Sequence, residues 1–208
     1  MKKSLVLIVL FVLPLVVYLF FASGVTNFGR LPILSGPVSE LSAFNSGIQL
    51  KDRITVLGFL GSDLRNRKGN VFNLNQKIYK PYFEFHDFQM VMVSPLGTEQ
   101  QADEIIKELS NFTDTKNWHF IFGDQQQIAL FFKGLNTDLT LDATGGTPYV
   151  FIVDKDLMLR GRTDDEDQGT KYGFDATAVA DLNNKMKDDI KIILAEYRLA
   201  LKKNNNTR

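Results

Sequence analysis

Hydrophobic residues follow two different periods along the chain. Apolar residues at every position or every second position fill four short runs, 54–60, 88–94, 118–122 and 149–153. This pattern predicts buried or half-buried strands. Apolar residues at helical spacing fill the stretches between them. These stretches are residues 70–85, residues 99–112, the segment after Asp124, and a long terminal stripe over 176–201.

The order of these elements predicts the architecture. A second strand at 157–162 follows the run 149–153 across a short polar turn, which favours an antiparallel hairpin. The chain therefore has the order β-α-β-α-β-α-β-β-α, and we expect an α/β fold with a mixed sheet and helices on both faces. The late strand–turn–strand–helix, entered through Thr147 and Pro148, points to a thioredoxin-like arrangement. We expect a cis peptide bond before Pro148.

The first 28 residues form a separate hydrophobic unit. Lys2 and Lys3 precede an uncharged run over 4–28 with an apolar heart at 5–21. A helix of about 20 residues crosses a bilayer core of roughly 30 Å, so this run predicts a transmembrane anchor; the alternative is a cleaved signal peptide. The lysines favour a cytoplasmic N-terminus, with the body on the periplasmic or outer side of the inner membrane.

The expected domain division follows from these patterns. Residues 1–24 form the cytoplasmic N-terminus and anchor, 25–47 a linker, 48–202 the α/β domain, and 203–208 a polar tail. Within the linker, short apolar pieces at 31–34 and 48–50 have the character of edge strands. The segment 164–172 is expected to be an acidic loop. It lacks the ligand order of a calcium site.

Composition removes several classes of function. Lys+Arg and Asp+Glu are both 24, so a nucleic-acid-binding protein with its usual basic excess is not indicated. Cysteine is absent from the whole sequence, which excludes disulfides, thiol nucleophiles and thiolate metal sites. His86 and His119 are the two histidines, too few for a histidine-rich metal site. The sequence predicts no cofactor.

The loop after the strand 54–60 is the best-placed position for chemistry, because ligands of α/β folds usually bind where strands end. It begins at Gly61 and Ser62. Ser62 has no histidine near it in sequence to act as a base, so the residues favour a polar loop leading into a helix over a catalytic serine. Residues 65–68 add a basic segment that we interpret as solvated.

Several segments resemble the SCO/SenC family. Residues 57–62 match the strand that carries a Cys-x-x-x-Cys copper site in that family, and residues 117–124 are similar to its Trp-x-Phe-x-x-Gly stretch. Residues 148–154 with 160–162 are similar to its late hairpin. The resemblance covers about 48–194 and implies a thioredoxin-like fold and a role in copper handling or cytochrome oxidase assembly. The family's two cysteines match Ser62 and Asn66, and its copper-binding histidine falls near Gly146. Because serine, asparagine and glycine do not hold Cu(I), the family's site is not carried over.

These observations predict a membrane-anchored binding or assembly factor without thiol chemistry and without enzymatic activity. Its expected partner is a protein, which by resemblance is a component of respiratory-complex assembly. We expect this partner to dock in a groove around Ser62, Asn66, Thr147 and Pro148. Two alternatives remain open. One is a copper metallochaperone with a relocated site drawn from Met90, Met92, His86 or His119. The other is an enzyme that uses Ser62.

Overall fold

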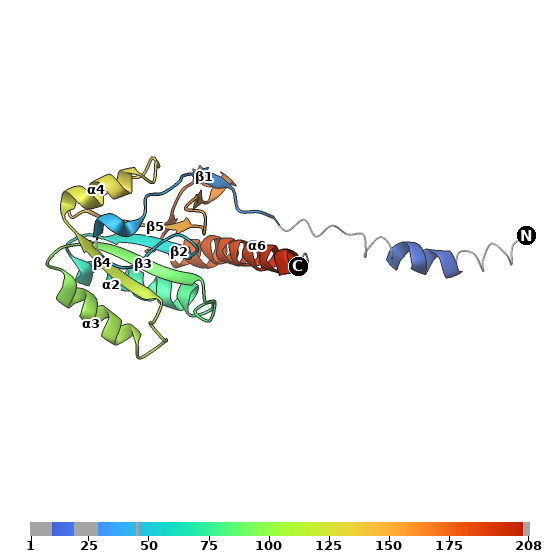
Figure 1. Ribbon diagram of the computed structural model, residues 1–208, viewed down its shortest axis with the longest axis horizontal. Coiled ribbons are helices and arrows are strands. Elements are labelled where there is room, and N and C mark those ends of the chain that lie inside the picture. Colours follow the sequence, from blue (N-terminus) through green and yellow to red (C-terminus); the bar gives the residue numbers. More distant parts are fainter. Residues whose placement is uncertain (1–9, 19–28, 45, 206–208) are drawn as a thin grey trace, which may run out of the picture.

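The computed structural model describes residues 10–18, 29–44 and 46–205, with side chains described up to residue 200. Residues 10–18 are helical and stand apart from the body (Figure 1). Of the helices in these ranges, none combines the length and apolar character needed to cross a membrane. Most of the hydrophobic run that predicts an anchor lies outside the described residues.

A mixed sheet forms the centre of the body. Its strands lie in the order β1-β6-β5-β2-β3-β4, and β9 pairs with β5. β2 is parallel to β3, and β3 to β4, whereas β5 runs antiparallel to β2. The strands of this sheet are β1 (Ile33–Ser35), β2 (Ile54–Leu60), β3 (Phe88–Pro95), β4 (Trp118–Gly123), β5 (Gly146–Val153), β6 (Leu159–Arg160) and β9 (Phe174–Asp175). All four strands expected from the hydrophobic runs are present.

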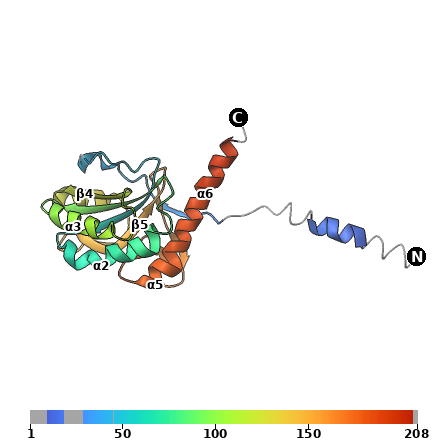
Figure 2. The same ribbon diagram turned by 90° about the horizontal axis from the view of Figure 1, so that it is seen from below.

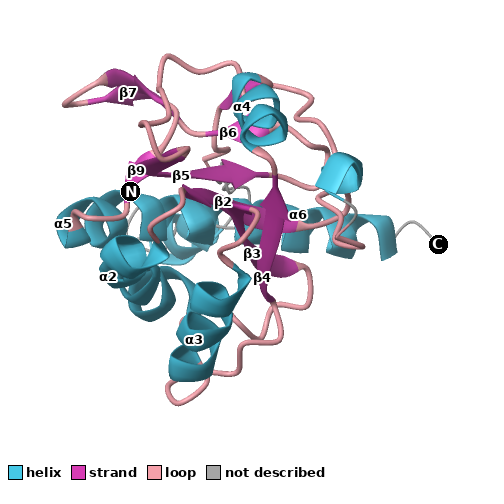
Figure 3. Ribbon diagram, turned by 90° about the vertical axis from the view of Figure 1, so that its left-hand side faces the viewer, coloured by secondary structure: helices cyan, strands magenta, loops and turns pink. Residues whose placement is uncertain are grey.

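Alternating side chains divide the interior into two cores. Ile54, Val56 and Leu60 of β2 face one cluster, and Leu57 and Phe59 face the other. The first cluster packs under α2, α3 and α6. The second packs under α4 and the 3-10 turn η1, as the layers in Figures 1 and 3 show. The prediction of helices on both faces is therefore confirmed.

Two of the helices, α2 and α4, begin at an aspartate whose side chain accepts a hydrogen bond from a backbone N–H of the first turn. The helical elements are η1 (Leu41–Phe44), α2 (Leu64–Leu74), η2 (Asn75–Tyr79), α3 (Glu99–Leu109), α4 (Gln125–Lys133), α5 (Val179–Asp181), η3 (Leu182–Met186) and α6 (Lys187–Asn205). Asp124 caps α4 with a reciprocal hydrogen bond to Gln127. Asp63 accepts from the Asn66 N–H and so starts α2 six residues earlier than hydrophobic spacing predicts.

Part of the segment expected to be a linker belongs to the body. β1 pairs with β6 at the edge of the sheet, and Leu31, Val38 and Leu41 are buried. The apolar piece at 31–34 thus contributes an edge strand, whereas 48–50 does not form one. The expected cis bond before Pro148 is wrong: within the described residues the cis peptide is Gly36–Pro37, and Thr147–Pro148 is a trans peptide of β5, where the register against β2 shifts.

The acidic segment 164–172 is a hairpin rather than a loop. β7 (Arg162–Asp165) and β8 (Gly169–Lys171) pair with each other and project from the sheet (Figure 3). Ion pairs hold this hairpin against η3 and the beginning of α6. Arg162 binds Asp189 at 2.7 and 2.8 Å, and Lys185 binds Asp165 at 2.7 Å. Apolar periodicity carried no signal for this pairing, because charged residues make it.

Arg160 connects three distant parts of the chain. Its guanidinium donates to the Leu31 carbonyl at 2.8 Å, to Asp154 at 2.7 Å and to Glu196 at 2.7 Å. Arg160 and Asp154 are almost fully buried. The edge strand, the β5–β6 hairpin and α6 are therefore fastened at a single side chain. We call Arg160, Asp154 and Glu196 the buried hub.

Candidate functional site

The candidate site lies where β2 ends and the antiparallel β5 begins. Leu60 is paired with Gly146, so the loop after β2 and the loop before β5 meet. Gly61 has a φ of 69°, which turns the chain sharply at the strand end. The Ser62 N–H then donates to the Thr144 carbonyl at 3.1 Å. The positions matching the family's first cysteine and its histidine are thus brought together.

Asp142 organises the second of these loops. One of its carboxylate oxygens accepts from the Thr144 N–H at 2.8 Å, the Thr144 hydroxyl at 2.5 Å and the Gly146 N–H at 3.2 Å. Burial alone would raise the pKa of Asp142. The hydrogen bonds from Thr144 and Gly146 and the positive charge of Arg67 outweigh burial, so the pKa is lowered from its ordinary value. Asp142 is therefore held as a carboxylate.

Arg67 fills the space between the two loops. It projects from the first turn of α2 and forms an ion pair with the other Asp142 oxygen. A β-carbon added to Gly146 would lie 2.9 Å from the Arg67 Nε and 2.8 Å from the Gly61 nitrogen. Glycine at 146 therefore lets the guanidinium lie against the backbone. We call Arg67, Asp142, Thr144 and Gly146 the loop clamp.

The residues predicted for the groove differ in accessibility. Ser62 and Asn66 are exposed. Thr147 is buried, and its hydroxyl accepts from the Tyr149 N–H at 3.4 Å. The half-buried Pro148 has its carbonyl engaged by the Ala176 N–H at 2.9 Å. The structure thus presents Ser62 and Asn66 at the surface and turns the Thr147 side chain inward.

The residues of the loop clamp other than Gly146 were not predicted. Arg67 was assigned to a solvated basic loop, although the Asp63 cap places it on a helix facing β5. The order Asp142-Ala-Thr144 is a signal that could have been used, since aspartate often accepts hydrogen bonds from the residue two positions on. The partner of that aspartate is 75 residues away in sequence. Local patterns therefore do not reveal it.

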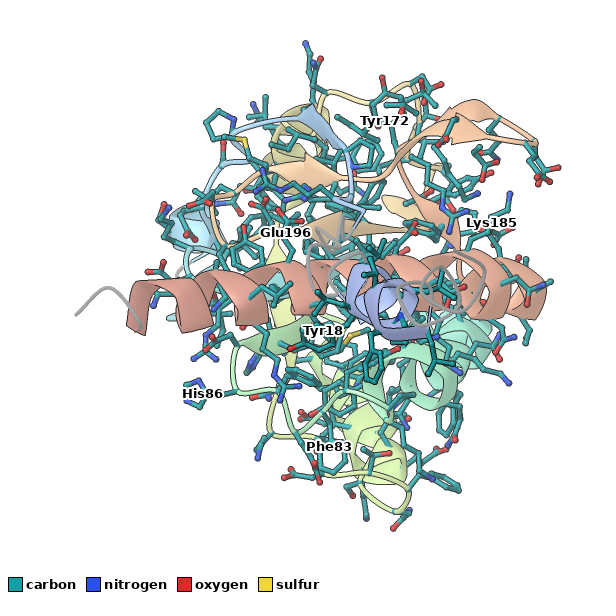
Figure 4. All side chains as sticks on the ribbon, turned by 90° about the vertical axis from the view of Figure 1, so that its right-hand side faces the viewer. Tyr18, Phe83, His86, Tyr172, Lys185 and Glu196 are labelled. Atoms are coloured by element: carbon teal, nitrogen blue, oxygen red, sulfur yellow. The ribbon has the colours of Figure 1, made fainter. Side chains whose placement is uncertain are left out.

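The residues of a relocated copper site do not converge. Met90 and Met92 are fully buried in the core under α2, α3 and α6. His119 is paired with Val91, whose side chain faces the opposite core. Burial, together with the charge of Arg53, lowers the pKa of His119. His86 is exposed beside Asp87 and points away from the body (Figure 4).

Ser62 also lacks a histidine partner. His86 precedes β3, whose first residue Phe88 pairs with Ile54 at the start of β2. Ser62 follows the other end of β2, whose length alone is about 20 Å at roughly 3.3 Å per strand residue, so His86 lies farther than that from Ser62. His119 pairs with Val91, which pairs with Leu57, so His119 lies level with the middle of β2 but on the second strand from it. Neither imidazole is placed to take a proton from the Ser62 hydroxyl.

Comparisons with known proteins define the class through the fold. No protein-family model and no curated protein sequence matches the chain. A putative electron transfer protein from Aquifex aeolicus VF5 has a similar structure, with a TM-score of 0.50 and 14% identity over 79% of this chain and 92% of that chain. At this identity the likeness concerns the fold, which is the predicted thioredoxin-like mixed α/β fold.

Sco proteins are among the structures that the chain resembles, as the sequence resemblance predicted. BsSco, a member of the Sco family of cytochrome c oxidase assembly proteins, gives a TM-score of 0.47 at 14% identity, covering 77% of this chain and 92% of that chain. A SCO1/SenC family lipoprotein from Bacillus anthracis str. Ames gives 0.44 at 19% identity, covering 82% and 95%.

Proposed function

We propose that this protein is a membrane-tethered assembly factor that binds a partner protein through the loop face at the end of β2 and performs no thiol or copper chemistry. The loop clamp is the observation that carries this proposal. This cysteine-free chain has a guanidinium–carboxylate pair between the two loops on which, by the resemblance, the copper ligands of the SCO/SenC family would lie. The clamp keeps the loops in place without a reactive group, which suits recognition.

The sequence feature that supports a membrane tether is the hydrophobic run over 4–28. Residues 10–18 are helical, and Leu10, Phe11, Leu13 and Tyr18 are each 60% exposed or more. Such an apolar surface is stable inside a bilayer and unfavourable in water. With Lys2 and Lys3 on the cytoplasmic side, the body faces the periplasmic or outer side.

The docking face combines exposed polar and apolar groups. Ser62 and Asn66 supply hydrogen-bonding groups beside the start of β5, and Pro148 lies at its half-buried border. Loops that follow parallel strands share one edge of a sheet, so Leu96, just after β3, belongs to the same face. Its side chain is 63% exposed. An apolar anchor with a polar surround is the usual composition of a transient protein interface.

The resembling structures suggest the biological setting. BsSco belongs to a family of cytochrome c oxidase assembly proteins. By this resemblance, the partner of the present protein is a component of respiratory-complex assembly. Binding, rather than catalysis, is the contribution that the loop clamp supports.

A pull-down from detergent-solubilised membranes tests this function, with the full chain as bait and Leu96→Glu as the interface variant. Leu130 on α4 is 64% exposed, so Leu130→Glu is a matched control with the same chemical change away from the docking face. We expect a respiratory-assembly protein to be retained by wild type and Leu130→Glu and lost from Leu96→Glu. Ser62→Ala and Asn66→Ala should weaken retention. Equal retention by all four variants contradicts the proposed surface.

Titration with Cu(I) separates this proposal from the metallochaperone alternative. The full chain in detergent should show no stoichiometric binding in competition with a chelator, because Met90, Met92, His86 and His119 do not converge. Binding that withstands mild chelation, and that Met90→Leu or His119→Gln abolishes, would replace our proposal by the chaperone.

A further inference from the structure

The outer edge of β4 is an open sheet edge, since no strand in the described part of the chain pairs with it. In the parallel register with β3, the Met90 N–H donates to the Asn117 carbonyl, so alternate residues of β4 direct their backbone groups to β3. Trp118, Phe120 and Phe122 therefore direct theirs outward. The Trp118 N–H is engaged by the Thr115 carbonyl at 2.9 Å.

This edge lacks the features with which proteins usually prevent edge-to-edge pairing, namely charges, prolines, bulges and very short strands. β4 is Trp-His-Phe-Ile-Phe-Gly, six residues with no proline and no Asp, Glu, Lys or Arg. The opposite edge has such features. β1 is three residues long, has a register shift against β6 and is followed by Gly36 and Pro37.

We infer that β4 pairs antiparallel with β4 of a second copy of this chain, so that two sheets become one. The register centred on Phe120 satisfies the outward backbone groups. Phe120 faces Phe120 of the partner subunit and supplies two hydrogen bonds, and each Phe122 N–H donates to the Trp118 carbonyl across the interface. Aromatic residues then oppose one another on one face, an arrangement that stabilises strand pairs.

Charges at the two ends of β4 favour this occupant. Lys116 precedes the strand, with its exposed ammonium 3.6 Å from the Asp114 carboxylate, and Asp124 follows it. In an antiparallel pair centred on Phe120, a residue four positions before Phe120 lies opposite the residue four positions after it in the other copy. Each Lys116 therefore lies opposite the Asp124 of the other copy. Asp124 uses one carboxylate oxygen to cap α4, which leaves the other for a lysine. Both ends of the strand are therefore complementary to a second copy.

Sedimentation of the full chain in detergent micelles tests this inference, with His119→Lys as the interface variant. A lysine at 119 would place two positive charges diagonally across the new strand pair. His86→Lys is the matched control, because it makes the same change at the exposed histidine that precedes β3, outside the β4 strand. We expect two chains per micelle for wild type and for His86→Lys. For His119→Lys we expect a dimer dissociation constant about tenfold higher.

Cross-linking of otherwise cysteine-free chains tests the register even if His119→Lys fails to fold. A mixture of Lys116→Cys and Gln125→Cys chains should give a cross-linked dimer with a short bismaleimide. Lys116→Cys alone should not, because its two copies lie eight residues apart along the strands, roughly 27 Å. A single wild-type chain per micelle, dimers unaffected by His119→Lys, or cross-linking of Lys116→Cys alone would each overturn the inference. Retention of the assembly partner by a monomeric protein would leave the proposed function intact.

Discussion

The protein contains two guanidinium–carboxylate assemblies that do the same topological task in different surroundings. The buried hub joins β1, the β5–β6 hairpin and α6, and the loop clamp joins α2 to the loop before β5. In the hub, the side chains of Arg160 and Asp154 are 4% and 2% exposed. In the clamp, those of Arg67 and Asp142 are 16% and 45% exposed.

This difference in burial predicts a structural role for the hub and, under the proposed function, a recognition role for the clamp. A charge left unpaired in a dry interior destabilises a fold strongly, whereas a partly hydrated pair contributes little because water replaces the lost partner. Burial lowers the pKa of Arg160, but the hydrogen bonds and charges of Asp154 and Glu196 raise it overall. The hub thus stays charged and holds the fold. The clamp is free to shape a surface.

Among the tests of this contrast, removal of the Arg160 guanidinium should have the largest effect on the free energy of unfolding. Arg160→Ala leaves Asp154 buried without its partner, and we expect the free energy of unfolding to fall by about 3–5 kcal/mol. Urea unfolding followed by the fluorescence of Trp118 measures it. Arg198→Ala, at an exposed position on the same helix as Glu196, should change stability by less than about 0.5 kcal/mol. A loss below about 1 kcal/mol for Arg160→Ala would remove the distinction between hub and clamp.

A methyl group at Gly146 tests the packing of the clamp. Gly146→Ala places its β-carbon 2.8 Å from the Gly61 nitrogen, and we expect a loss of about 1–3 kcal/mol through forced backbone movement. Gly69 on α2 has no atom within 4 Å of an added β-carbon. Gly69→Ala should therefore raise stability by up to about 1 kcal/mol through helix propensity. Thermal unfolding that moves in the same direction for both variants would contradict this packing.

Loss of the Arg67 charge has a smaller expected effect on the fold. Arg67→Gln should lower the free energy of unfolding by no more than about 1 kcal/mol, because the pair is partly exposed. Partner retention in the pull-down should nevertheless weaken, since the ion pair between α2 and the loop before β5 is lost. A stability loss as large as that of Arg160→Ala would make the clamp a structural element like the hub.

The pH dependence of stability gives the most delicate test. The folded pKa of Asp142 is below its ordinary value, so its carboxylate stabilises the fold at all pH values above the unfolded pKa of about 3.9. This contribution is lost as pH falls through the folded pKa. Urea midpoints of wild type and Asp142→Asn should differ at neutral pH and converge in acid. A gap that widens on acidification would reverse the sign of the pKa shift.

Periodicity was enough to predict the sheet and the helix layers because hydrophobic burial dictates both. The runs 54–60 and 149–153 are apolar because both faces of their strands are covered. The β7–β8 hairpin and the loop clamp depend instead on charges far apart in sequence. Arg162 and Asp189 are 27 residues apart, and Arg67 and Asp142 are 75 apart. One sequence contains no spacing rule for such pairs.

The start of α2 illustrates an intermediate case. Asp63 followed three residues later by Asn66 is a readable capping signal, but the hydrophobic stripe that was used to place the helix begins only at Val71. A reading based on caps would have put Arg67 on a helix facing β5. The identity of its partner, Asp142, could still be known only from the three-dimensional fold, because the two residues are 75 apart in sequence.

The attachment of Leu31 has a consequence for how far the body can travel. The Arg160 bond to the Leu31 carbonyl fixes the chain to the sheet from residue 31 onward. If residues 5–21 span the bilayer, the free leash is residues 22–30, nine residues, which reach about 30 Å when fully extended. Figure 2 shows the chain leaving the body beside α6. Under that condition the domain would sample only a thin layer of solvent above the lipid, and it would meet proteins of the same membrane more often than freely diffusing ones.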